Sequence, residues 1–165
     1  MMDYIELAEK KLKEYRLLER SIDNMTAEIH RLKMAGAPRE LSAISYDNFG
    51  IRGSNKQNEA INIACAIADY QEIRLLNQKE IKRINANLNF ISRELGKEDY
   101  GELLRLWYMG LREQNLETGF IEYKKISVEE ICERLQYSAG SRRYFYERKD
   151  DALGKFAKAY YGVRT

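Results

Sequence analysis

Proline is nearly missing from this chain of 165 residues, where it occurs once, and glycine occurs only ten times. A β-rich fold with many tight turns depends on both residues, so their scarcity argues against such a fold. The chain also lacks any apolar run near the ~20 residues that a membrane-spanning helix needs. Its opening segment, MMDYIELAEKKLKEYRLLERS, carries charges throughout, which excludes a secretory signal. We therefore expect a helical cytoplasmic protein that makes no contact with a membrane.

Histidine and cysteine are too few for the common catalytic and metal-binding arrangements. The one histidine, His30, has no cluster of carboxylates or thiols around it in the sequence, and we interpret it as a surface residue. The two cysteines, Cys65 and Cys132, have neither metal nor redox spacing, and we expect both to be reduced and buried on helix faces. The glycines form no phosphate-binding motif. The sequence thus predicts no catalytic site, no metal site and no cofactor.

The first 96 residues are predicted to form two long helices. One runs from Asp3 to Met34 and the other from about Asn58 to Leu95, with a loop at about 35–57 between them. Apolar residues follow heptad spacing, namely Tyr15, Leu18, Ile22, Met25, Ile29 and Leu32 in the first helix, and Ala60, Ile63, Ile67 and Tyr70, then Ile81, Ile84, Leu88, Ile91 and Leu95 in the second. The two runs of the second helix are out of phase, which indicates a stutter, a kink or a change of partner. We expect a coiled-coil-like antiparallel hairpin over residues 1–96 that forms a homodimer or contacts another protein.

Residues 97–165 are predicted to form a second domain with three shorter helices. Its first helix lies in the segment EDYGELLRLWYMGL and has Leu103, Leu104 and Trp107 at the spacing of a buried face. The polar segment 112–125 follows without a helical period, and we interpret it as an irregular linker.

The last two helices are predicted to form a helix-turn-helix. Ser127 and Glu130 have the spacing of a capping box, and the helix that they begin should end near Leu135. After the turn, Ser141 is a suitable N-cap for the last helix. The buried side of that helix consists of Phe145, Ala152, Leu153 and Phe156. The expected fold class is all-α, with a long N-terminal helical hairpin followed by a small helix-turn-helix domain.

Neither sign of charge predominates, since the chain has 28 Lys and Arg and 26 Asp and Glu. Any binding to nucleic acid must therefore come from local charge. Between Ser138 and Lys149 there are four basic residues and one acidic residue, which gives a local balance of +3. In a helix-turn-helix, the N-terminal part of the second helix reaches base edges while nearby Arg and Lys hold phosphates. The candidate DNA-binding residues are Ser138, Ser141, Arg142, Arg143, Tyr146, Arg148 and Lys149. The alternative is that the arginines only solvate a surface helix.

The segments LLRLWYMG, ISVEEICERLQYS and SRRYFYERKDDALGKFAKAYYG occur in the order of a known type of domain. They resemble the region-4-like domain of bacterial sigma factors and, more closely, phage-encoded transcriptional regulators of the ArpU and RinA type. The loop residues Tyr46, Asp47, Gly50 and Gly53 are also similar to that phage group. The resemblance implies a late-gene activator that binds double-stranded DNA and contacts host RNA polymerase. Because serine occurs at both Ser138 and Ser141, either residue can begin the recognition helix.

A second function fits the same pattern. Small terminase subunits and related phage packaging proteins also join a helix-turn-helix to long helices that assemble into rings. The heptad spacing suits such a ring as well as a dimer. A coiled-coil adaptor without a role in nucleic-acid binding is a third possibility, but it leaves the basic cluster unexplained.

Overall fold

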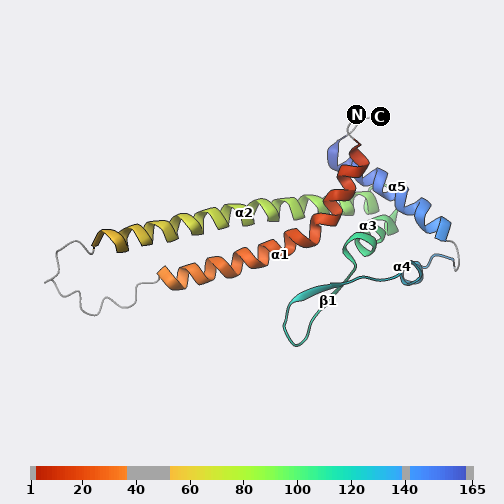
Figure 1. Ribbon diagram of the computed structural model, residues 1–165. Coiled ribbons are helices and arrows are strands. Elements are labelled where there is room, and N and C mark those ends of the chain that lie inside the picture. Colours follow the sequence, from red (N-terminus) through yellow and green to blue (C-terminus); the bar gives the residue numbers. More distant parts are fainter. Residues whose placement is uncertain (1–2, 37–52, 139–141, 163–165) are drawn as a thin grey trace. The chain divides into compact units, whose positions relative to one another are not determined.

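The structure is a computed structural model that describes residues 3–36, 53–138 and 142–162, with side chains described from residue 57 in the second range (Figure 1). Its elements are α1 (Tyr4–Gly36), α2 (Gly53–Arg93), α3 (Glu98–Leu104), the π-helical turn η1 (Arg105–Met109), β1 (Leu111–Gln114), β2 (Ile121–Lys124), α4 (Val128–Arg134) and α5 (Arg142–Tyr161). The part of the chain that the structure describes is therefore helical apart from one pair of strands, which confirms the predicted fold class. No helix among these residues is long and apolar enough to cross a membrane.

The chain divides into two compact units. Residues 1–17 and 80–165 form one, which we call the core unit, and residues 18–79 form the other, which we call the long-helix unit. The division falls inside α1 and α2, at other residues than the predicted boundary at 96/97. The reason is that the first turns of α1 and the last turns of α2 supply part of the core, through Ala8, Leu12, Tyr15, Ile84, Leu88 and Ile91.

In the long-helix unit, α1 and α2 run side by side and antiparallel, as predicted (Figure 1). Arg74 Nη1 donates to Thr26 Oγ1 at 3.3 Å, and Asn77 Nδ2 donates to Ser21 Oγ at 3.0 Å. The predicted seam of α1 lies inward, with every member buried or half-buried.

The two predicted runs on α2 are in phase, which corrects the expectation of a stutter. Half-buried or buried residues follow a 4-3 spacing along the whole helix, at Ile63, Ile67, Tyr70, Arg74, Asn77, Ile81, Ile84, Leu88 and Ile91. Arg74 and Asn77 continue the seam with polar side chains, so a count of apolar residues misses it. Leu95 lies beyond the end of α2 and is 43% exposed, and Ala60 is also exposed.

Two further expectations for this region need correction. Cys65 is exposed, because it lies on the face of α2 opposite to the seam, whereas Cys132 is half-buried. The helix α2 begins at Gly53, within the predicted loop at 35–57. Residues 35–36 of that loop belong to α1, and residues 37–52, with Tyr46, Asp47 and Gly50, lie outside the described residues. His30 is exposed, as predicted.

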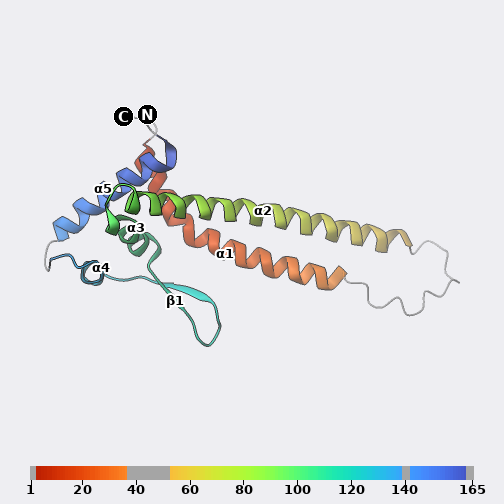
Figure 2. The same ribbon diagram turned by 180° about the vertical axis from the view of Figure 1, so that it is seen from behind.

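In the core unit, α3 and α5 lie beside the C-terminal end of α2 in both views, and α4 contacts α5 and η1 (Figure 2). Leu103 and Leu104 are fully buried, as predicted, while Trp107 is half-buried. The close packing of α3 on α2 depends on Gly101, where a Cβ would lie 2.4 Å from Ser92 Oγ and 2.7 Å from the Leu88 carbonyl oxygen. Any larger residue at this position would push α3 away from α2.

The segment 112–125 is not an irregular linker, as its sequence suggested, but an antiparallel β-hairpin. Leu111 pairs with Lys124 and Gln114 with Ile121. The turn is closed by Asn115, whose Oδ1 accepts from the backbone N–H groups of Glu117 and Thr118 at 2.9 and 3.2 Å. Such side-chain to backbone bonds fix a turn without proline, so the hairpin was not predicted from the pattern of residues.

The predicted start of α4 is confirmed. Ser127 Oγ accepts from the Glu130 backbone N–H at 3.2 Å, and a Glu130 carboxylate oxygen accepts from the Ser127 N–H at 2.8 Å, which completes the capping box. The predicted inward side of α5 is also confirmed, because Phe145, Ala152, Leu153 and Phe156 are all buried.

Candidate nucleic-acid interface

The helices α4 and α5 are joined by the turn of the predicted helix-turn-helix. Gln136 adopts a left-handed backbone with φ of 56°, which reverses the chain after α4. Ser138, the last described residue before α5, is exposed. Ser141 lies outside the described residues, so its role as N-cap stays a prediction.

The first turn of α5 presents two arginines to solvent. The side chains of Arg142 and Arg143 are 76% and 90% exposed. No acidic residue lies in this turn. Positive charge at a helix N-terminus interacts unfavourably with the helix dipole. The two arginines therefore do not stabilise the start of their own helix through its dipole.

Both exposed arginines have carboxylate neighbours. Arg142 Nη2 lies 2.7 Å from Glu129 Oε1, which connects the first turn of α5 to α4. Arg143 Nε lies 2.7 Å from Glu147 Oε1 within α5. A hydrogen bond from Arg142 lowers the pKa of Glu129. Ion pairs this exposed contribute little to stability, so a phosphate can replace the carboxylate at small cost.

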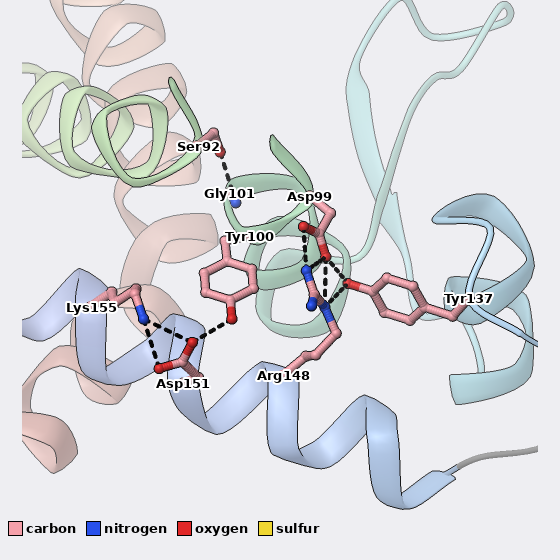
Figure 3. Close-up of polar contacts among 8 residues, drawn as sticks. All are labelled: Ser92, Asp99, Tyr100, Gly101, Tyr137, Arg148, Asp151 and Lys155. Carbon is pink, nitrogen blue, oxygen red and sulfur yellow. Dashed lines mark hydrogen bonds and ion pairs between the residues drawn. The ribbon is translucent and has the colours of Figure 1, made fainter. Parts of the chain in front are cut away.

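Arg148 was predicted to contact DNA, but the structure places it inside the core unit (Figure 3). Its guanidinium binds both carboxylate oxygens of Asp99 at 2.6 and 2.7 Å, and both side chains are only 22% exposed. The Tyr137 hydroxyl donates to the same carboxylate. The rings of Tyr100, Tyr137 and Tyr144 surround the guanidinium, with its carbon 4.9 to 5.4 Å from their centroids. Arg148 thus connects α5 to α3 and to the turn, and we leave it out of the candidate interface.

The titration of these groups follows from the same contacts. Burial raises the pKa of Asp99, but the hydrogen bonds from Arg148 and Tyr137 outweigh it, so the net pKa lies below the ordinary value of 3.8. Burial and a hydrogen bond to Asp99 raise the pKa of Tyr137. The cluster therefore holds an ionised carboxylate, a cation and a neutral phenol at neutral pH.

A second polar contact lies one turn further along α5 (Figure 3). The Tyr100 hydroxyl donates to Asp151, and Lys155 Nζ lies 2.8 Å from both oxygens of that carboxylate. Burial and the bond to Asp151 raise the pKa of Tyr100 to about 12. Together the two contacts fix the position of α5 on α3.

Lys149 and Tyr146 lie against an aromatic group at the edge of the candidate interface. The Lys149 side chain is only 17% exposed, and Nζ lies 5.8 Å from the Trp107 centroid and 2.9 Å from Asp150 Oδ1. Tyr146 packs edge-on to Trp107 but remains 41% exposed. Of the seven predicted residues, Ser138, Arg142, Arg143 and Tyr146 are exposed, whereas Arg148 and Lys149 make internal contacts.

The local balance of +3 from the sequence changes once tertiary neighbours are included. Asp99 and Glu129 lie outside the segment from Ser138 to Lys149, but they pair with Arg148 and Arg142. The carboxylate of Asp99 is 49 residues away from Arg148, so a local window of sequence does not reveal it.

Among the described residues, no group of three or more His, Cys, Asp and Glu side chains is placed to hold a metal ion. The chain matches no protein-family model, no curated protein and no solved structure. The resemblance to sigma region 4 and to the phage regulators therefore stays a prediction.

Proposed function

We propose that this chain is a DNA-binding transcriptional regulator that contacts duplex DNA through the start of α5. The observation that carries the proposal is the pair of exposed arginines, Arg142 and Arg143, in the first turn of the second helix of a helix-turn-helix. This is the part of the motif that enters the major groove. Tyr146 and Ser138 are exposed beside them and supply hydroxyl groups for phosphates or base edges.

The internal contacts of α5 support this assignment, because a recognition helix has to be held in a fixed position to contact DNA. Arg148 and Asp151 connect α5 to α3 behind the exposed arginines. In the proposed complex, phosphates replace Glu129 and Glu147 as partners of Arg142 and Arg143. The resemblance to the ArpU and RinA regulators favours a phage or prophage late-gene activator that works in the cytoplasm and recruits RNA polymerase.

The test is a measurement of duplex binding by Arg142→Glu/Arg143→Glu. The purified protein is first incubated with fragments of its source genome at two salt concentrations, and the recovered fragments are sequenced. We expect one short site upstream of a gene block, and an affinity for it that falls about 100-fold or more in the double variant. Replacing both arginines with neutral residues should also reduce the slope of log K against log salt by about 2.

The matched control is Arg20→Glu/Arg93→Glu, which changes the net charge equally at two exposed arginines outside α5. It should retain most of the affinity, and circular dichroism should show the same helical content in all three proteins. Equal affinity of the wild type and the Arg142/Arg143 variant would remove α5 from the interface. Weak binding to every fragment that disappears with salt would leave only non-specific backbone attraction.

One observation supports the alternative function as a packaging protein. The helix α2 exposes apolar side chains that are suited to assembly. The oligomeric state separates the two functions. A monomer or dimer favours the regulator, and a stable ring of eight or more subunits favours the packaging protein.

A further inference from the structure

The helix α2 has a second apolar face in addition to the one that contacts α1. Leu75 and Leu76 are 50% and 56% exposed. They lie opposite to the inward seam at Tyr70, Arg74 and Asn77. A helix that packs on one neighbour needs only one apolar face, so this second face indicates a further partner.

Two charged residues bracket the exposed leucines symmetrically. Glu72 lies three residues before Leu75, and Lys79 lies three residues after Leu76. All four residues share one side of the helix, because they are spaced by three, one and three. Glu72 and Lys79 are seven residues or roughly 10 Å apart along the axis, which is too far for an ion pair between them. Neither has an ion-pair partner among the residues that the structure describes.

We propose that two copies of the chain pair through this face of α2, antiparallel, with a twofold axis between Leu75 and Leu76. In this register the two copies of Leu75 pack on each other on one side of the axis, and the two copies of Leu76 do so on the other side. Each Glu72 then faces a Lys79 of the other copy, so two ion pairs flank the leucines. A parallel pair in the same register instead places Glu72 against Glu72 and Lys79 against Lys79, where like charges repel.

The symmetry of the charges identifies a second copy as the occupant. In a twofold contact the same surface appears on both sides, so every group on it must find its complement within that surface. The segment from Glu72 to Lys79 meets this requirement, since acid faces base and leucine faces leucine. A different protein or a nucleic acid would not require this arrangement.

The first experiment measures the oligomeric state of the full chain by sedimentation equilibrium over a range of concentrations. We expect a dimer for the wild type and a monomer for Leu75→Ser/Leu76→Ser. Glu72→Lys and Lys79→Glu should each weaken the dimer about tenfold, and the double variant Glu72→Lys/Lys79→Glu should restore it. The control is Leu17→Ser, which removes a leucine that is 71% exposed on α1 and should leave the dimer unchanged.

The second experiment determines the orientation by oxidative cross-linking. In the antiparallel register the two copies of Cys65 are about 30 Å apart along the helices, so Cys132→Ser should form no disulfide dimer. Leu75→Cys in a Cys65→Ser/Cys132→Ser background should cross-link readily, because its two copies meet at the axis. A monomeric wild type, a dimer that keeps its strength when the leucines are replaced, or a Cys65 disulfide would each overturn the proposal.

The dimer proposal and the proposed function can be tested independently of each other. Duplex binding depends on Arg142 and Arg143 in α5, whereas pairing depends on Leu75 and Leu76 in α2. A monomer that binds one half-site through α5 would remove the dimer and leave the DNA contact in place. A dimer that binds no duplex would do the opposite.

Discussion

The core unit and the long-helix unit are both helical, but different interactions hold them together. The core unit contains nearly all of the buried apolar side chains that the structure describes, and its polar groups pair across elements far apart in sequence. Among the described residues of the long-helix unit, Ile29 is the one apolar side chain that is buried. Two helices alone leave most of each seam half-buried, so this unit gains less from its own packing and more from any partner.

The largest expected effect on stability comes from truncating a buried side chain of the core unit, compared with a half-buried one of the long-helix unit. Phe156 is fully buried in the core unit, and Phe156→Ala should lower the free energy of unfolding by about 3–5 kcal/mol. Ile63 is only half-buried in the long-helix unit, so Ile63→Ala should cost about 1 kcal/mol. Chemical denaturation followed by circular dichroism measures both. Equal costs would mean that the two units are packed to the same density.

A smaller effect is expected from the cluster around Arg148. Asp99→Asn leaves the guanidinium without its charged partner, and we expect a loss of about 1–3 kcal/mol at neutral pH. Because the folded state lowers the pKa of Asp99, its contribution is complete above the ordinary value of 3.8 and is lost as pH falls through the folded pKa. When the pH is lowered below about 4, the melting temperature of the wild type should therefore decrease.

The same titration in Asp99→Asn tests the assignment. The variant should start from a lower melting temperature and lose less of it on acidification. The control is Glu147→Gln, which removes an exposed carboxylate of α5 and should change stability by less than about 0.5 kcal/mol. An unchanged pH dependence in Asp99→Asn would assign the acid sensitivity to other carboxylates, such as Asp151.

The smallest expected loss of stability comes from removing a hydrogen bond in the long-helix unit. Asn77→Ala removes the hydrogen bond to Ser21, and it should cost about 0.5–1.5 kcal/mol. The polar seam position also fixes the register of α1 on α2, so the α2 amides of the variant should be less protected from exchange. Hydrogen exchange of these amides is the measurement. Full protection in the variant would show that the apolar seam alone sets the register.

Much of the fold could be read from local patterns. Heptad spacing predicted α1 and most of α2, and the pair Ser127 and Glu130 predicted the start of α4. These features depend on residues within one or two helical turns of one another, so they are visible without knowledge of the tertiary structure. The β-hairpin was missed because its turn depends on the side chain of Asn115 and its strands have no alternating apolar pattern.

The sequence by itself determined the all-helical class, the order of the last two helices and the presence of two adjacent arginines near the start of the last one. Only the tertiary structure decided which cations are available to a partner, because Arg148 meets Asp99 across 49 residues of chain. It also decided that the seam of α2 continues through Arg74 and Asn77, and that Leu75 and Leu76 lie outside it. The physical reason is that local periodicity sets where a helix forms, whereas the burial and pairing of each side chain depend on neighbours that only folding brings together.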